Sequence, residues 1–522
     1  MMTGKGLSYS GRDVPWLVEH HATHHADHVF LIWEPFQGPS RSWTYKTFAD
    51  DVSSIAAGLI ARGVCAGDRV LIHLDNCPEL ILAWYACARI GAVAVTTNTR
   101  SVGNDLAYFA EHSEIVGAIT QPALADLVAA NAENISWMVV IETNPTAKAP
   151  EEKRRGGYEP FSSLYGDPEK APDRAHDPMS PVGIQYTSGT TSRPKAVLWT
   201  HANALWGAQV NACHFMLRSD DITLCFNPLF HTNAQAYSVL ASLWVGATVV
   251  LLPKFSVSRF WEVSLRHKCT WASMIPFSVK ALMTVEIPAR HHYRFWGVAV
   301  SLPQVEEAFG VKTLGFWGMT ETITHGVVGN LHQKEPLMSI GYPAPEYDIA
   351  VVDDDGSPVE SGETGHLLIR GVRGISLFLE YFKNPEATRD SFDEAGWFHT
   401  GDLVTVTKEG HFLFADRDKD MLKVGAENVA TAEIEGVINA TGVVNEVAVV
   451  GQKHRMLDEV PVAFVIPLPH APENIEEIIL SACRKDLADF KVPTAVYIVD
   501  EFPRSTLEKI SKVDLRKRLP EI

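Results

Sequence analysis

A short run of small, mostly hydroxylated residues follows an apolar segment near the middle of the chain. Residues 182–186 read Val-Gly-Ile-Gln-Tyr, which predicts a buried strand. The residues that follow are Thr187, Ser188, Gly189, Thr190 and Thr191. Gly189 permits a tight turn in which backbone N–H groups converge on one anion, and the hydroxyl groups and Lys195 add donors and a positive charge. The pattern predicts a polyphosphate-binding loop, although GxxxxGKS and GxxxxGKT are absent.

A second segment carries three different chemical groups directly after a predicted strand at 312–316. These residues are Trp317, Gly318, Met319, Thr320 and Glu321. Trp317 offers a broad aromatic face on which adenine can stack, and Thr320 can donate to an α-phosphate. Glu321 is a candidate ligand for Mg²⁺, a hard cation that prefers oxygen atoms. A core aromatic residue followed by a helix cap is the structural alternative, but it does not explain why all three groups lie in one segment.

Three further segments carry weaker signals. Asp402 ends a Thr-Gly-Asp turn after an aromatic strand, where its planar carboxylate could accept hydrogen bonds from both hydroxyl groups of a ribose. Gly297-Val298-Ala299 follows a strand predicted at 293–296, and the missing side chain at Gly297 lets a flat base approach the backbone closely. His231 ends the apolar run that starts at Asn227. By itself, it is typical of a satisfied, partly buried histidine.

These segments resemble the motifs of the adenylate-forming superfamily, which contains acyl-CoA synthetases, peptide-synthetase adenylation domains and beetle luciferases. The run YTSGTTSRPKAVLWTH from Tyr186 to His201 is similar to the signature loop of that family, with Ser192 and Ala196 where glycine is usual. The Thr-Ser-Arg-Pro-Lys variant and the run HLDNCPE at 73–79 look most like crotonobetaine/carnitine–CoA ligases. The resemblance covers nearly the whole chain.

The resemblance implies roles for residues that chemistry alone does not assign. It implies that Thr190 acts on the phosphates, that His231 orients the acyl carboxylate, and that 297–299 form the adenine wall. It assigns Lys509 to a bridge between the acyl carboxylate and the α-phosphate. The family usually has glycine just before this lysine, whereas this chain has Glu508.

A run of five charged residues at 416–420 is followed by a predicted hairpin at 421–428. The resemblance implies that Arg417 contacts the ribose and phosphates and that the chain pivots at Lys419. It also implies that Gly425 lines the channel for the pantetheine arm of coenzyme A, with Lys423 on the same face. The predicted domains are therefore 1–417, which binds ATP and the acyl substrate, and a lid at 418–522.

Strands and helices alternate along the first part of the chain. Strands are predicted at 70–73, 91–95 and 116–119, and helices at 77–90 and 104–113. This order predicts a parallel sheet with helices on both faces. The predicted fold class is α/β: a large N-terminal domain of two stacked α/β subdomains with a small β-rich subdomain, then a small, mobile α+β lid. A long loop is predicted at 142–180.

The composition and net charge of the chain limit the kinds of partner that it is expected to bind. The chain has 522 residues, 46% apolar and 21% charged residues, and a net charge of −18, which disfavours nucleic acid and anionic membranes. The longest apolar run, 239–252, is too short for a membrane span, so we expect a cytoplasmic protein. Homo-oligomerisation is compatible with the sequence.

The seven scattered cysteines predict no disulfide or zinc framework. A solvated segment, rather than a metal site, is predicted for His20, His21, His24, His25 and His28.

The resemblance and the motifs together predict an ATP-dependent carboxylate–CoA ligase that uses ATP, Mg²⁺ and coenzyme A. The acid would form an acyl-adenylate with release of pyrophosphate, and the CoA thiol would then displace AMP. Transfer to a carrier protein, luciferase-like oxygenation and a non-catalytic nucleotide sensor are the alternatives. The acid could be carnitine or crotonobetaine, which needs an aromatic or acidic cage, or a fatty, aromatic or steroid acid.

Overall fold

The computed structural model describes residues 9–147, 157–171, 174–187, 194–417, 422–424, 427–454, 458–469, 471–487, 489–504 and 510–519. The chain divides into two compact units, which are described separately. The first comprises Met1–Gly189, Arg193–Asp348 and Arg370–Gly396, and the second Thr190–Ser192, Ile349–Ile369 and Trp397–Ile522. The predicted boundary near Lys419 lies outside the described residues and stays a prediction.

The first sheet of the first unit is mainly parallel. Its strands, in spatial order, are β19 (Glu380–Tyr381), β9 (Lys195–Thr200), β8 (Pro181–Thr187), β4 (Val93–Thr96), β3 (Arg69–His73), β5 (Ile115–Thr120), β6 (Trp137–Val140) and β7 (Glu159–Pro160). The pairs from β8 to β7 are parallel, whereas β9 pairs antiparallel with both β8 and β19. The strands and helices predicted between residues 70 and 119 are confirmed, with ends shifted by at most two residues in each strand.

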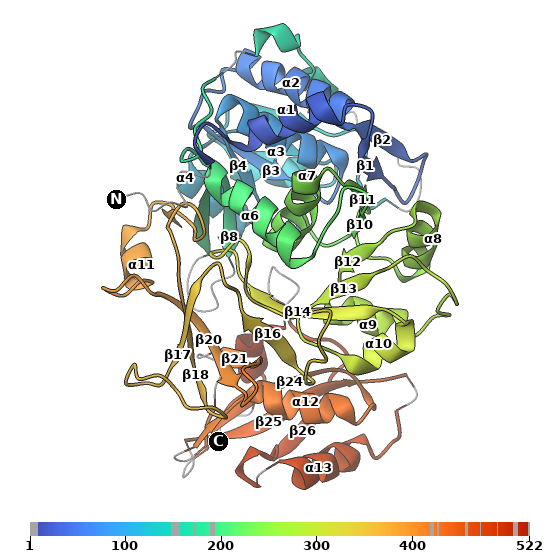
Figure 1. Cartoon of the computed structure of the whole chain (residues 1–522), viewed down its shortest axis with the longest axis vertical. Coiled ribbons are helices and arrows are strands. Elements are labelled where there is room, and N and C mark those ends of the chain that lie inside the picture. Colours follow the sequence, from blue (N-terminus) through green and yellow to red (C-terminus); the bar gives the residue numbers. More distant parts are fainter. Residues whose placement is uncertain are drawn as a thin grey trace. The chain divides into compact units, whose positions relative to one another are not determined.

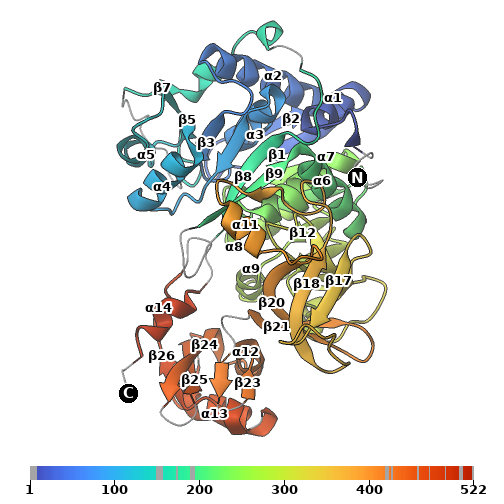
Figure 2. The same cartoon turned by 90° about the vertical axis from the view of Figure 1, so that its left-hand side faces the viewer.

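Helices cover both faces of this sheet. Figure 2 shows α4 (Gly103–Ser113) and α5 (Ala125–Asn131) on one side, and α2 (Tyr45–Ala61) and α3 (Pro78–Ile90) on the other. On the first side, Leu71 and Val95 of the strands pack with Phe109 of α4. Helix α3 begins with a proline at its first turn and ends at Gly91, whose φ of 76° suits a glycine C-cap.

The second sheet of this unit is also parallel at its centre. Its strands, in order, are β16 (Ser339–Pro343), β15 (His325–Val328), β14 (Lys312–Gly318), β13 (Phe295–Val298), β12 (Trp271–Ser273), β10 (Ile222–Cys225), β11 (Thr248–Leu251), β1 (Val29–Trp33) and β2 (Arg41–Thr44). The pairs β14–β15, β15–β16 and β1–β2 are antiparallel, and the others are parallel. The predicted stacking of two α/β subdomains is therefore present as two helix-covered sheets.

One face of the second sheet is covered by α8 (Val257–His267), α9 (Pro276–Leu282) and α10 (Pro303–Phe309), whose apolar residues share a core with Leu224 and Trp296 of the strands. Helices α6 (His201–His214) and α7 (Ala241–Val245) pack against each other and against the π-helix η4 (Asn233–Leu240), as Figure 1 shows for α6 and α7. π-helical turns are rare and are frequent at functional sites. The described residues of this unit also form α1 (Val14–His24), η2 (Phe161–Leu164), η3 (Pro168–Lys170) and α11 (Pro385–Asp390).

The second unit contains an antiparallel sheet and a smaller α+β part. The sheet has the order β17 (Asp348–Val352), β18 (Thr364–Arg370), β20 (Phe398–Val406) and β21 (Phe412–Arg417). The smaller part has the order β23 (Glu427–Val429), β22 (Leu422–Val424), β25 (Asp458–Pro467) and β24 (Val444–His454), with β26 (Ala495–Ile498) on β25. Its helices are α12 (Thr431–Ala440), α13 (Ile475–Asp486), η6 (Asp489–Lys491) and α14 (Lys512–Arg516). The β-rich sheet and the small α+β part that the sequence predicts are both present, and the role of the α+β part as a mobile lid stays a prediction.

Three local predictions need correction. His21 is buried rather than solvated, and its Nε2 lies 3.3 Å from the carbonyl oxygen of Trp244. Burial lowers the pKa of His21 to about 4. The predicted loop at 142–180 contains β7 and two 3₁₀ turns among its described residues. Gly297 and Val298 lie inside β13 rather than after it. Within the described part of the chain, no helix has the length and apolarity required to span a membrane.

Candidate active site

The two ends of the predicted phosphate loop lie side by side. Thr187 is the last residue of β8 and Lys195 is the first residue of β9, and the two are register partners in the antiparallel pair. The Thr187 hydroxyl donates to Lys195 O over 3.4 Å. Ser188, Gly189, Thr190 and Thr191 lie outside the described residues, so their role stays a prediction. The sequence did not predict the strand β9, which fixes Lys195 beside β8.

Lys195, Tyr381 and Glu321 form a linked set. Lys195 Nζ lies 4.5 Å from the centroid of the Tyr381 ring, a cation–π contact. The hydroxyl group of Tyr381 donates to Glu321 Oε1 over 2.8 Å. Burial and the neighbouring Glu321 carboxylate raise the pKa of Tyr381 above its usual value, which keeps the phenol protonated as a donor. Sequence reasoning missed Tyr381, because no motif or spacing connects residue 381 with residue 321.

Glu321 is nearly buried, with 4% of its surface exposed, and its backbone carbonyl accepts a hydrogen bond from Phe378 N over 2.8 Å. Among the described residues, no group of three or more His, Cys, Asp or Glu side chains is placed to hold a metal ion. A single carboxylate fits a cation that takes its remaining ligands from phosphate oxygens and water, as Mg²⁺ commonly does. The described residues therefore fit a nucleotide-bound Mg²⁺ rather than a caged structural metal.

Thr320 belongs to a hydrogen-bonded chain that joins three predicted segments. Its Oγ1 lies 3.2 Å from Oγ1 of Thr232, which donates to Gln185 Oε1 over 2.7 Å. Gln185 in turn donates to Gln235 of the π-helix. The backbone carbonyl of Thr320 accepts a bond of 3.0 Å from the indole N–H of Trp199. This network fixes the turn that carries Thr320 and Glu321 against β8 and η4.

His231 lies at the start of the π-helix and is half-buried. Its Nδ1 accepts from Asn233 N over 3.3 Å, and its carbonyl accepts from Gln235 N over 3.1 Å. Asn76 holds the loop before it by accepting from Leu229 N over 2.8 Å and donating to Asn227 O over 2.9 Å. The side chain of Asn76, in the HLDNCPE run, thus positions His231, a role that the sequence did not reveal.

The residues predicted to contact adenine lie on adjacent strands. Gly297 and Val298 are in β13, Ala299 follows and is exposed, and Trp317 is in β14 with 6% of its surface exposed. A Cβ added at Gly297 would meet the Phe316 ring at 3.1 Å. At Gly318 it would lie 2.5 Å from Thr324 O and 2.6 Å from the Tyr237 hydroxyl. The close approach of these two oxygen atoms leaves no room for a side chain at residue 318, so glycine is required there.

Gly318 is followed by Met319, whose carbonyl accepts from the amide groups of both Thr322 and Ile323. The Met319 N–H is bonded to the Thr322 hydroxyl over 3.1 Å. These bonds shape the turn from which the side chains of Thr320 and Glu321 project.

In the second unit, two predicted nucleotide contacts are neighbours. Asp402 in β20 and Arg417 at the end of β21 are register partners in an antiparallel pair. The Asp402 N–H is bonded to Thr400 Oγ1 over 3.1 Å, and Asp402 is 6% exposed. Only the backbone of Arg417 and of Lys423 is described. Lys419, Gly425, Glu508 and Lys509 lie outside the described residues, so their roles stay predictions.

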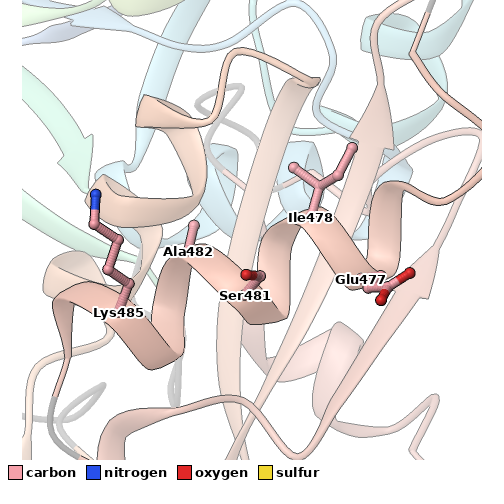
Figure 3. Close-up of a pocket in the computed structure, with 5 residues that line it drawn as sticks. All are labelled: Glu477, Ile478, Ser481, Ala482 and Lys485. Carbon is pink, nitrogen blue, oxygen red and sulfur yellow. The ribbon is translucent and has the colours of Figure 1, made fainter.

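A surface hollow of about 450 Å³ lies along α13 of the second unit. Figure 3 shows its lining side chains along this one helix: Glu477, Ile478, Ser481, Ala482 and Lys485. None of them is a predicted site residue. A binding site is usually built from polar groups that converge from several elements, so this hollow is not a candidate for the chemistry.

Comparisons with known proteins give a consistent result. A model described as "AMP-binding enzyme" matches residues 18–382, and one described as "AMP-binding enzyme C-terminal domain" matches residues 433–509. The crotonobetaine/carnitine–CoA ligase of Salmonella paratyphi C (strain RKS4594) is 32% identical over 509 residues, which cover 94% of this chain and 96% of that protein.

Two solved structures have the same fold. The chain superposes with a TM-score of 0.83 and 25% identity on the o-succinylbenzoate CoA synthetase of Bacillus subtilis in complex with ATP and a magnesium ion, covering 96% of this chain and 99% of that chain. An anthranilate CoA ligase in complex with anthranoyl-AMP gives a TM-score of 0.87 at 24% identity, with 99% of each chain covered.

Proposed function

This chain belongs to the family of AMP-binding enzymes and is an acid–thiol ligase, and we propose that the cluster around Glu321 is where its carboxylic acid meets ATP. The acid and ATP form an acyl-adenylate and pyrophosphate, and the thiol of coenzyme A then gives the acyl-CoA and AMP. The observation that carries the proposed site is the linkage of Lys195, Tyr381 and Glu321, with Thr320 beside it. These groups come from distant parts of the sequence and combine a cation, a carboxylate and hydroxyl donors.

In the first step, a carboxylate oxygen attacks the α-phosphorus of ATP, and the bond from that phosphorus to the leaving pyrophosphate breaks. Both reactants are anionic, so positioning and charge compensation must supply most of the catalysis. Lys195 and the Thr320 hydroxyl would contact the phosphates, and Glu321 would hold the nucleotide's Mg²⁺. When bound, Mg²⁺ neutralises phosphate charge. His231 would orient the carboxylate, and Asn76 would keep the His231 loop in place.

In the second unit, Asp402 and Arg417 would hold the ribose and phosphates. The register of β20 and β21 supports this assignment, because cross-strand partners lie close enough to act on one ligand. Lys509 would serve adenylation, whereas Lys423 and Gly425 would serve thioester formation. A rotation near Lys419 would exchange these two faces of the lid, since the half-reactions need different groups at one place.

The lid assignments can be tested by measuring the two half-reactions separately. A Lys509→Ala variant should lose acyl-adenylate formation, while still forming the thioester from a supplied acyl-adenylate. A Lys419→Pro variant should lose thioester formation and keep pyrophosphate release. Lys517, an exposed lysine later in the sequence, provides the control Lys517→Ala, which should change neither step. Equal loss of both steps in the Lys509→Ala variant would contradict its proposed role.

The candidates for the acid substrate come from the names of the relatives and from the sequence. The named relatives support a trimethylammonium acid, and fatty, aromatic and steroid acids are the other candidates. ATP- and CoA-dependent AMP release should be measured for each class of acid, including a trimethylammonium acid and its uncharged isostere. Faster turnover of the charged acid would support the first candidate, and equal or slower turnover would remove it.

A cytoplasmic location and homo-oligomerisation are expected as well, and fractionation and light scattering would test them.

A further inference from the structure

One face of helix α13 in the second unit is hollowed and carries charged side chains. The helix packs Ile475, Ile479 and Cys483 into the core of the small α+β part. A second face, which this core does not cover, bears the hollow of about 450 Å³ described above. Figure 3 shows Glu477 and Lys485 at the two ends of this hollow, with shorter side chains between them. The hollow is therefore a strip along the helix axis with one charged group at each end.

The charges of this strip are ordered along the helix. Acidic residues lie in the first turn, at Glu476 and Glu477, and basic residues lie in the last turn, at Arg484 and Lys485. All four residues are exposed. The helix macrodipole favours the same order, so the charges alone do not require a partner. Their spacing is more specific, because Glu477 and Lys485 each lie four residues from Ser481, at the middle of the hollow.

A second copy of the same helix fits this strip when it lies antiparallel across a two-fold axis at Ser481. Glu477 of each copy then faces Lys485 of the other copy, whereas a parallel arrangement would bring like charges together. Ser481 and Ala482 have short side chains, which permit a close approach of the two helix axes, and the half-buried Ile478 adds apolar contact. The strip is thus complementary to itself, as the contact surface of a two-fold dimer must be.

The charge of the whole chain also bears on which partner fits the strip. The net charge of −18 makes two copies repel each other in general. A contact between copies therefore needs opposite charges brought face to face, and both ends of the strip provide them. A uniformly basic partner would meet like charge at Lys485, and a uniformly acidic partner would meet it at Glu477. A second copy meets opposite charge at both ends.

We propose that α13 pairs with α13 of a second copy, so that the protein forms a two-fold dimer through its small α+β parts. The inference does not depend on the proposed function of the Glu321 cluster, and it gives the expected homo-oligomer a defined surface. One helix from each copy makes a small interface, so the dimer should be weak and should dissociate on dilution. Because its charge pairs are exposed, association should also weaken as the salt concentration rises.

Analytical ultracentrifugation of the full chain, over a range of protein and salt concentrations, tests the proposal. The Glu477→Lys and Lys485→Glu variants each convert both opposite-charge pairs into like-charge pairs. The dissociation constant of each variant should therefore rise roughly tenfold or more. An equimolar mixture of the two variants should recover association, because a basic strip then meets an acidic one. The double variant Glu477→Lys/Lys485→Glu should recover self-association for the same reason.

Two further variants separate the contact from general effects of charge. Lys517→Glu is the matched control, because Lys517 is exposed in the same unit and lies outside α13. It changes the net charge as Lys485→Glu does, and it should leave the dissociation constant unchanged. Ser481→Trp should weaken association without any change of charge, because its bulky side chain fills the place where the two helices cross. These residues are exposed, so each variant should fold with a Tm near that of the wild type.

A wild-type protein that stays monomeric at every concentration would overturn the proposal, as would charge reversals that leave association unchanged. A mixture of the two single variants that associates no better than either variant alone would also overturn it. The charges of α13 would then serve the helix macrodipole only. Pyrophosphate exchange by the same variants reports separately on the proposed function, because no residue of the strip belongs to the Glu321 cluster.

Discussion

The hydroxyl group of Tyr381 donates a hydrogen bond of 2.8 Å to Oε1 of Glu321, from 60 positions further along the chain. The same ring lies under Lys195 Nζ, 4.5 Å from its centroid. One side chain thereby connects the cation and the carboxylate that are assigned to the phosphates and their metal ion. Tyr381 is a positioning residue in this account, because it acts through its neighbours.

Replacing Tyr381 by phenylalanine should weaken the metal site more than the fold. The ring and its contact with Lys195 remain, but a buried carboxylate loses a donor, which costs roughly 1–3 kcal/mol. We expect the Mg²⁺ concentration at half-maximal pyrophosphate exchange to change by at least threefold, with a modest fall in Tm. Tyr158→Phe is the control, because Tyr158 Oη bonds to Asp126 on the surface. An unchanged Mg²⁺ dependence in the Tyr381→Phe variant would show that this hydrogen bond does not position Glu321.

Gly318→Ala should disrupt the turn that carries Thr320 and Glu321. The added methyl group would lie 2.5 Å from a backbone oxygen and 2.6 Å from the Tyr237 hydroxyl, so the strand must move. Overpacking of this kind costs about 1–3 kcal/mol, and ATP binding should weaken at least tenfold. The matched control is Gly436→Ala in α12, where an added Cβ meets nothing within 4 Å. That change should raise stability by about 0.5–1 kcal/mol, since alanine is the better helix former.

The pair Asp402 and Arg417 leads to a prediction about the sugar of the nucleotide. Loss of a hydrogen bond to a charged group costs about 1.5–3 kcal/mol, so Asp402→Ala should weaken ATP binding roughly tenfold to a hundredfold. The wild-type enzyme should bind 3′-deoxy-ATP more weakly than ATP, and the variant should bind both alike. Asp354→Ala, which removes an exposed partner of His366 in the same unit, should keep the preference for ATP. If the variant still discriminates between the nucleotides, Asp402 does not bind the ribose.

Two buried histidines predict how stability depends on pH. Burial is the largest cause that lowers the pKa of His73 to about 4 and that of His201 to about 3. Below pH 6.5 both histidines are protonated in the unfolded chain but stay neutral in the folded protein. The free energy of unfolding therefore falls as the pH falls toward 4. Each histidine contributes at most about 1.4 kcal/mol per pH unit in this window and nothing to the slope above it.

Urea unfolding of the first unit at pH 7.5, 6.5, 5.5 and 4.5 would measure this dependence. The His73→Gln variant should have a shallower slope between pH 6.5 and 4.5 than the wild type and the same slope between 7.5 and 6.5. Parallel curves for variant and wild type over the whole range would contradict the assignment of His73 as neutral in the folded state.

Much of the fold could be predicted from local pattern. Alternation of apolar strands with helical segments gave the parallel sheet of β3, β4 and β5, and Pro78 and Gly91 mark the ends of α3 in the sequence itself. Thr320 and Glu321 could be identified because residue types that suit a nucleotide gather in one short segment. Asp402 and Arg417 were identified separately, and only the register of β20 and β21 makes them neighbours.

The residues that were missed depend on contacts between distant parts of the chain. Tyr381 lies in a two-residue strand whose place is set by pairing with β9, and β9 was itself not predicted. Asn76 acts on a loop about 150 positions away. Burial also reversed the expectation for His21, because the periodicity of α1 turns this one histidine of the cluster toward the core.

The central claim is that the Glu321 cluster joins a carboxylic acid to the α-phosphate of ATP. Exchange of labelled pyrophosphate into ATP, measured without coenzyme A over a broad panel of acids, tests it most directly. We predict exchange that requires both an acid and Mg²⁺ and that falls at least a hundredfold in the Glu321→Gln variant, which should still fold with a Tm near that of the wild type. Exchange that never depends on an acid, or that survives intact in the Glu321→Gln variant, would contradict the account.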